Sequence, residues 1–159
     1  MNAIDLMTLE HGAIKSGLTC LETLAHRAAR TGRIDRALVD GVLSFFRGFS
    51  DQIHHGKEEN VLFPWLVSKE LGGEGGVVAD LTHEHDELRA LAAKMSASIR
   101  ALDVDAALRF SELAKTYVSL LRSHVRREDD HLFGAASLVA SLAEQEQLTM
   151  ACQVLDRPL

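Results

Sequence analysis

The sequence contains few residues that interrupt helices and few that form disulfides. Of its 159 residues only two are proline, Pro64 and Pro158, and only two are cysteine, Cys20 and Cys152. Scarce proline leaves long segments free to stay helical. Cysteines this far apart form neither a disulfide framework nor a Cys-x-x-Cys site, so a reducing, cytoplasmic location is the expected one.

Long apolar runs are missing as well. No segment approaches the roughly 20 apolar residues that a membrane-spanning helix needs, and the N-terminus lacks the basic start and apolar run of a signal peptide, so we expect no membrane partner. The formal net charge of −6 disfavours nucleic acid and anionic membrane surfaces as partners. No Ser-His-Asp order, phosphate loop or dinucleotide fingerprint indicates hydrolytic or nucleotide chemistry.

Apolar residues recur every three or four positions over most of the chain, which predicts helices and no strands. Four long helices are expected at about 2–30, 35–66, 77–101 and 106–136. The glycine-rich stretch 72–76 is the clearest break and divides the chain into two halves. A shorter amphipathic segment at about 138–155 predicts a fifth helix. The expected fold is all-α: an up-down-up-down four-helix bundle at 1–136, with a short C-terminal helical extension of the same domain at 137–159.

Histidine is abundant, with eight residues, and two stretches share a histidine motif. His54 and Glu58 are four residues apart in QIHHGKEENVLFPWL, and His124 and Glu128 repeat that spacing. In both copies a Leu-Phe pair begins four residues after the glutamate. Residues i and i+4 lie on one face of a helix, where an imidazole and a carboxylate can bind one metal ion.

Two further histidines lie on the apolar stripes of the other long helices. His11 and His85 each occupy a position where a core residue is expected, and each follows a glutamate, Glu10 or Glu84. Each half of the chain therefore has a Glu-His helix followed by a His-x3-Glu helix. This pattern indicates a duplicated helix pair with approximate two-fold symmetry.

A lone histidine on an apolar stripe is more often a hydrogen-bonded core residue than a metal ligand. Here the inward positions of four helices carry six ionisable side chains, and burying two carboxylates without counter-charge is costly. The predicted metal ligands are His11, His54, Glu58, His85, His124 and Glu128. The set has nitrogen and oxygen but no thiolate, which disfavours structural zinc and suits iron, with manganese or mixed metals as alternatives. The two-fold pattern predicts two ions bridged by Glu58 and Glu128, with coordination positions left open.

The neighbouring pair His55 and Glu59 leaves an alternative. On a helical wheel of about 100° per residue, His54 and Glu58 continue the inner face, whereas His55 and Glu59 rotate away from it. We expect His55 and Glu59 to be exposed or to orient a ligand, although one residue of helical irregularity would exchange the two pairs. Other expectations are that His26 lies on the surface, His83 faces away from His85, His131 lies at the rim and Tyr117 packs in the core.

These motifs resemble the hemerythrin-like family, the His-His-Glu cation-binding helical bundles. HHGKEENVLFP and SHVRREDDHLF resemble its paired His-x3-Glu motifs, and LEHGAIK and THEHDEL resemble its two Glu-His segments. The four motifs occur in the family's order between about Leu6 and Ala136. The resemblance implies a non-haem di-iron site in a four-helix bundle, with room for an oxo or hydroxo bridge.

Two departures from the oxygen-carrying hemerythrins bear on function. Leu81 stands where those proteins have an additional histidine, and His124-x3-Glu128 replaces their His-x4-Asp, with Asp129 as the fallback ligand. A redox, sensing or iron-handling role is therefore favoured over reversible oxygen carriage.

The resemblance implies a di-iron protein that binds or reacts with a small diatomic ligand or peroxide, in oxygen, nitric oxide or redox sensing, storage or scavenging. The alternative is an iron-responsive regulatory or metal-carrier module that acts through a protein partner or a homo-oligomer. A structural bundle without metal is the third hypothesis.

Overall fold

The computed structural model describes residues 1–72, 75–101 and 103–156, which form five continuous helical segments. The first is α1 (Ala3–Thr31), the third is α4 (Val77–Arg100) and the fifth is α7 (Leu142–Leu155). The second consists of α2 (Arg36–Phe45), the π-helical η1 (Phe46–His55) and η2 (Glu58–Leu62), and α3 (Phe63–Ser68). The fourth consists of α5 (Ala106–Arg127), the π-helical η3 (Glu128–Leu132) and α6 (Phe133–Val139).

All five predicted helices are present, and the described residues contain no strand. The largest difference in bounds is at the fifth helix, which was predicted to begin near 138 and begins at Leu142, after Ser141 caps its N-terminus. Residues 73–74 of the predicted glycine-rich break and 157–159 of the predicted extension lie outside the described residues. None of the described helices is long and apolar enough to cross a membrane.

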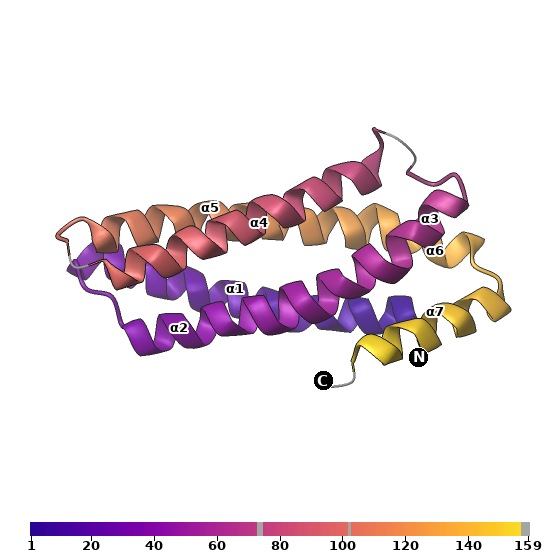
Figure 1. The fold of residues 1–159 in the computed structure, drawn as a ribbon, viewed down its shortest axis with the longest axis horizontal. Helices are drawn as coiled ribbons and strands as arrows, with labels where there is room; N and C mark the ends of the chain where they lie inside the picture. Colours follow the sequence, from indigo (N-terminus) through magenta and orange to yellow (C-terminus); the bar gives the residue numbers. More distant parts are fainter. Residues whose placement is uncertain (73–74, 102, 157–159) are drawn as a thin grey trace.

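The four long helical segments lie side by side along the long axis of the molecule (Figure 1). Their buried apolar side chains form two separate clusters. One includes Ile14, Leu88 and Leu121, and the other includes Met7 and Leu81. On each long segment, the buried histidines and glutamates lie between the residues of one apolar cluster and those of the other. A polar layer therefore divides the core.

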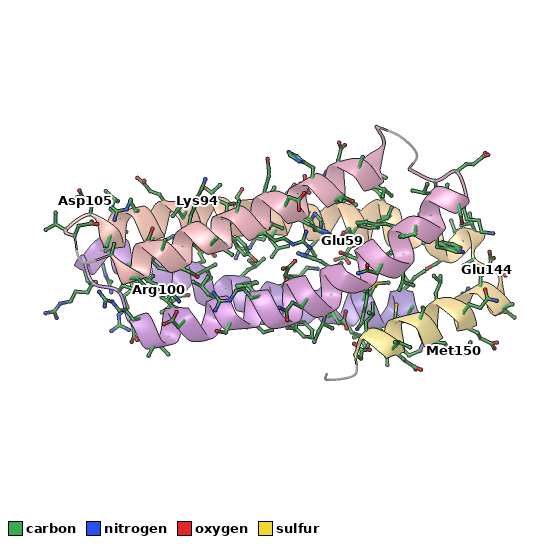
Figure 2. The ribbon with its side chains drawn as sticks, in the orientation of Figure 1. Glu59, Lys94, Arg100, Asp105, Glu144 and Met150 are labelled. Carbon is green, nitrogen blue, oxygen red and sulfur yellow. The ribbon has the colours of Figure 1, made fainter. Side chains whose placement is uncertain are left out.

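The C-terminal helix α7 packs against the end of the bundle that carries the N-terminus (Figure 1). The Ala3 amide donates to Thr149 Oγ1 at 3.0 Å, and Cys152 is buried in the same apolar cluster as Met7. Glu144 completes a capping box with Ser141, and Met150, on the same helix, is exposed (Figure 2). The predicted fifth helix therefore packs against one end of the bundle.

Two of the long segments change from α-helical to π-helical hydrogen bonding near the predicted ligands. The change covers Phe46–His55, Glu58–Leu62 and Glu128–Leu132. A π turn closes hydrogen bonds from i to i+5 and so holds one more residue than an α turn. The helical wheel used for the sequence prediction does not apply across these turns.

Candidate metal centre

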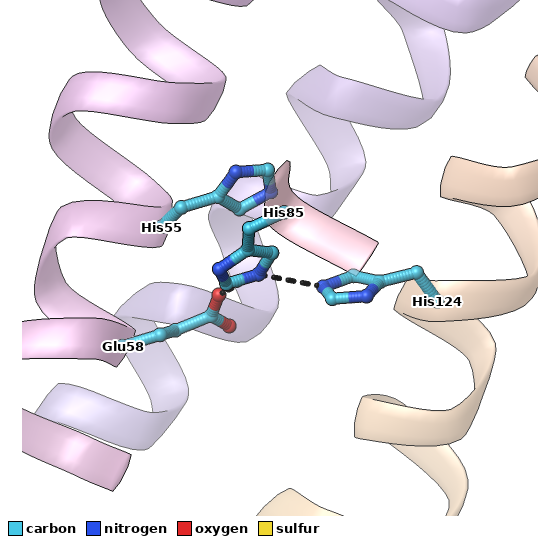
Figure 3. Close-up of side chains that lie close together, drawn as sticks. All are labelled: His55, Glu58, His85 and His124. Carbon is cyan, nitrogen blue, oxygen red and sulfur yellow. Dashed lines mark hydrogen bonds and ion pairs between the residues drawn. The ribbon is translucent and has the colours of Figure 1, made fainter. Parts of the chain in front are cut away.

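The structure brings all six predicted ligands together in the polar layer. Each has a relative exposure of 0%. Together with His55, these residues form two groups of four. In each group, one nitrogen or oxygen atom from every residue lies within 4.8 Å of the corresponding atoms of the other three. One group is His11, His54, Glu58 and Glu128, and the other is His55, Glu58, His85 and His124, shown in Figure 3.

Glu58 belongs to both groups. Its Oε1 lies 3.4 Å from His54 Nε2, and its Oε2 lies 3.4 Å from His85 Nε2. The two oxygens of one carboxylate therefore face histidines contributed by the two different halves of the chain.

Glu128 has the equivalent position on the other side. Its Oε2 lies 3.3 Å from His11 Nε2, and its Oε1 lies 3.0 Å from His124 Nε2. In both carboxylates, neither oxygen has a hydrogen-bond partner among the described residues. Two buried carboxylates aimed at facing imidazoles are an arrangement that two bound cations would stabilise.

The outer nitrogen of each of these four histidines, Nδ1, lies within hydrogen-bonding distance of a carboxylate. The pairs are His11 with Asp129 at 2.6 Å, His54 with Glu10 at 2.9 Å, His85 with Glu59 at 2.7 Å and His124 with Glu84 at 2.8 Å. A proton held on Nδ1 by a carboxylate leaves the Nε2 lone pair directed at the centre, which is the form that binds metal.

Each of those four carboxylates is in turn paired with a cation. The pairs are Asp129 with Lys15 at 2.7 Å, Glu10 with Lys57 at 2.5 Å, Glu59 with Arg89 at 2.7 Å and Glu84 with Arg127. Each of the four outer carboxylates thus has a cation partner, and two of these cations are shared: Lys57 also pairs with Asp156, and Arg89 also pairs with Asp51 and Asp86. Only Glu58 and Glu128, in the middle, lack a fixed cation.

The electrostatics of the metal-free centre follow from this arrangement. Burial opposes the charged form of His124, but the nearby Glu128 and the hydrogen bond to Glu84 outweigh it and raise the pKa of His124 to about 10. The same balance raises the pKa of His11. The buried carboxyl of Glu128, although opposed by desolvation, has its pKa lowered well below its usual value by His124 and His11. Protons on imidazoles therefore supply the counter-charge that a metal would supply.

A family model described as the hemerythrin HHE cation-binding domain matches residues 2–136. The chain belongs to the hemerythrin family. The resemblance seen in the motifs is thereby confirmed. The matched residues end before α7, so this helix is an addition to the part that the family model covers. A search of curated proteins found no match to the sequence.

In this hemerythrin-family chain, the expectation for His55 is wrong. His55 is 2% exposed, and its ring stacks on that of His85 with centroids 3.9 Å apart and planes 11° apart (Figure 3). Neither ring nitrogen has a hydrogen-bond partner. The cause is the π-helical turn that ends at His55, which directs two consecutive histidines into the interior.

Burial, and the neighbouring His85, His54 and His124, lower the pKa of His55 well below its usual value. His55 is therefore a neutral imidazole with unused nitrogens, inside a group of potential ligand atoms. His55 is the one residue of these two groups that the six predicted ligands do not include.

Glu59 and Asp129 are not among the grouped ligand atoms. Glu59, labelled in Figure 2, pairs with His85, and Asp129 pairs with His11, so each orients a histidine from outside the centre. Of the two roles expected for Glu59, orientation is the one the structure supports.

The remaining expectations agree with the structure. His26, His83 and His131 are exposed, Tyr117 is buried, and Leu81 packs in an apolar cluster. The cations behind the orienting carboxylates were not predicted. The internal repeat could have identified them, because Lys57 and Arg127 each follow the second-helix histidine by three residues, while Lys15 and Arg89 follow the first-helix histidine by four.

Proposed function

We propose that this hemerythrin-family protein is a non-haem di-iron protein whose centre binds or reacts with a small diatomic ligand or peroxide, for sensing, storage or scavenging. The observation that carries the proposal is the pair of buried carboxylates, Glu58 and Glu128. Each directs one oxygen toward each group of histidines, and neither has a fixed counter-charge. Family membership supports cation binding at this place.

In this proposal His11 and His54 would hold one ion, and His85, His124 and His55 would hold the other, with Glu58 and Glu128 each offering one oxygen to each side. Mixed nitrogen and oxygen donors without thiolate suit iron. The ions are held by consecutive helices of an up-down-up-down bundle at 1–136, with 137–159 as an extension of the same domain. We propose His55 as a ligand in addition to the six residues predicted from the sequence.

The bound ions would supply Lewis-acid and redox chemistry. The protein's own contribution is to orient four imidazoles through the carboxylates at their Nδ1 atoms, to keep a fifth, His55, neutral by burial, and to leave coordination positions open. The histidines are divided two and three, so the side with His11 and His54 offers fewer protein donors. We assign the exogenous ligand to the side with His11 and His54, because that side has fewer protein donors.

The test is the metal content and visible spectrum of protein purified in air, followed by addition of azide or nitric oxide. About two irons per chain, as in di-iron bundles, with a spectrum that changes on ligand addition, would support the proposal. His85→Ala should lose metal, while His83→Ala, an exposed histidine on the same helix, should retain it. Zinc, or iron whose spectrum responds to none of these ligands, would contradict it.

A second function, an iron-responsive regulatory module, is favoured by one contact. Lys57, which is buried and pairs with Glu10 behind His54, also pairs with Asp156 at the end of α7 at 2.5 Å. The helix outside the family match is thus joined to the centre through three side chains. Hydrogen exchange of α7 that is the same with and without metal would contradict this function.

A further inference from the structure

The end of the bundle that lies opposite α3 and α6 carries a cluster of arginines. The C-terminal turns of α1 and α4 and the N-terminal turns of α2 and α5 meet there (Figure 1), and Arg100 and Asp105 mark this end in Figure 2. Residues 26–36 and 100–109 contain six arginines, no lysine and three aspartates, although the net charge of the chain is −6. The arginines are Arg27, Arg30, Arg33, Arg36, Arg100 and Arg109, and we call the surface that they form the arginine end.

Most of these arginines have no carboxylate partner among the described residues. Arg109 is the exception, and it pairs with Asp103 at 2.7 Å. Asp35 caps α2 by accepting a hydrogen bond from the Leu38 amide, and Asp40, one turn further along α2, pairs with no described cation. By contrast, the two arginines beside the metal centre are both paired with carboxylates. Five exposed and unpaired arginines make this end a positive surface on an acidic protein, and such a surface attracts anionic groups.

Helix electrostatics explain some of these positions but not all of them. Arg30 and Arg100 lie in the last turns of α1 and α4, where a cation stabilises the helix through its dipole. Arg33 lies between α1 and α2, and Arg36 is the first residue of α2, where the same dipole disfavours a cation. The fold itself does not require the charges of Arg33 and Arg36, so both are available to a partner.

The side chains at this end are of the types that protein interfaces favour. The planar guanidinium of arginine can bind a carboxylate through two parallel hydrogen bonds, and interfaces are enriched in arginine and depleted in lysine. Two large apolar side chains are exposed at the same end: Val104, between α4 and α5, is 95% exposed, and Leu38, in the first turn of α2, is 52% exposed. Interfaces combine such apolar contacts with paired charges.

The size of the positive surface favours a short acidic segment as the occupant. A nucleic acid or an anionic membrane is an extended polyanion, and it would also meet the acidic remainder of the molecule. A short segment with carboxylate side chains can cover the arginine end alone. It can also bring apolar side chains of its own to Val104 and Leu38.

We propose that the arginine end is a docking surface for an acidic segment of a partner protein. Its carboxylates pair with Arg33, Arg36 and the neighbouring arginines, and its apolar side chains contact Val104. The proposal does not rest on the proposed function, because none of these residues belongs to the candidate metal centre. Part of the larger apolar cluster, including Ala28 and Ile99, lies between this surface and the centre.

The test is fluorescence titration of the full chain, with its metal content measured, against a labelled peptide of glutamates with leucine at every fourth position. Arg33→Gln combined with Arg36→Gln should weaken peptide binding about tenfold, as expected for two exposed charges, without lowering the melting temperature. Lys115→Gln combined with Arg126→Gln removes two exposed cations from α5 away from this end, and should change the affinity less than twofold. Val104→Ser should weaken binding about threefold, as expected for loss of a small apolar contact.

Several results would overturn the docking surface. Equal weakening by the two double variants would show that the peptide responds to net charge alone. Equal affinity for a peptide with glutamine in place of glutamate, or no saturable binding of the acidic peptide, would remove the role of the carboxylates. A single-stranded oligonucleotide that binds at least tenfold more tightly than the peptide, and loses this affinity in the Arg33→Gln, Arg36→Gln variant, would assign the surface to nucleic acid. Peptide binding by a chain that takes up no metal would support the docking surface and contradict the proposed function.

Discussion

The two halves of the molecule build their shares of the centre from the same parts. Each supplies a histidine from its first helix, a histidine and a glutamate from its second, and two carboxylates paired with two cations. Pairing crosses between helices in the same way in both halves: Glu10 orients His54 as Glu84 orients His124. The shared parts are the potential ligands and the side chains that orient them, so the repeat specifies two similar groups of potential ligand atoms.

Two of the differences between the halves add groups to the first half. The residue after His54 is His55, whereas the residue after His124 is the buried apolar Val125. Lys57 is fully buried and has Asp156 as a second partner, whereas its counterpart Arg127 is partly exposed. The first half thus adds an imidazole to the centre and a connection to α7. The two halves are therefore not equivalent around the centre.

The largest effect is expected from the two glutamates, where the halves are most alike. Glu58→Gln and Glu128→Gln each remove a buried negative charge that faces both groups of histidines, so each should reduce metal content from about two ions per chain to below one. Elemental analysis would check this, with Glu59→Gln as the control that keeps most of its metal. A large difference between Glu58→Gln and Glu128→Gln would show that the two glutamates are not equivalent.

The metal-free protein should lose stability as pH rises. The folded-state pKa of His124 is about 10, above its ordinary value of 6.5, so its charge stabilises the fold fully below pH 6.5, and this contribution is lost as pH approaches 10. At about 1.4 kcal/mol per unit of pKa shift, we expect the free energy of unfolding to fall by at most roughly 5 kcal/mol across this range. Urea unfolding of chelator-treated protein at several pH values would measure it.

The same experiment compares the halves, because His124→Gln should remove more of this pH dependence than His11→Gln. Metal-loaded protein serves as the control and should depend less on pH, since the ions replace the protons. A metal-free protein that is equally stable at pH 6.5 and pH 9.5 would contradict the assigned charge of His124.

Removing the extra imidazole should make the halves alike. His55→Val copies Val125 into the first half, and loss of one donor should weaken the more tightly held ion by about 100-fold. The metal-free variant should be at least as stable as the unchanged protein, because an unpaired buried imidazole is lost. Chelator competition and thermal unfolding measure the two effects, and unchanged metal affinity would show that His55 is no ligand.

The smallest effect is expected at the connection to α7. Asp156→Asn leaves buried Lys57 with Glu10 alone, and should cost about 1 kcal/mol because Asp156 is partly exposed. Asp130→Asn, an exposed carboxylate, should change the free energy of unfolding little. Denaturant titration of both variants tests this, and equal effects would mean that the Lys57–Asp156 contact contributes nothing specific.

The helices and six members of the centre could be predicted because they follow regular rules. Apolar spacing located all five helices, and the repeated His-x3-Glu motif identified inward residues on the second and fourth segments. His55 could not be predicted, because the wheel assumes α-helical hydrogen bonding and Phe46–His55 is π-helical. The partner cations were not predicted either, although their spacing after the histidines repeats in the sequence. Which carboxylate each cation pairs with depends on how the helices pack.

The π-helical turn at Phe46–His55 also affects how such a centre can change by mutation. A π turn contains one residue more than the α turn that would replace it. A single inserted or deleted codon in this stretch can therefore convert one form into the other, while the helix on either side keeps its register with the bundle. The shortest genetic route by which this protein gains or loses an imidazole at its centre is then a change in chain length by one residue.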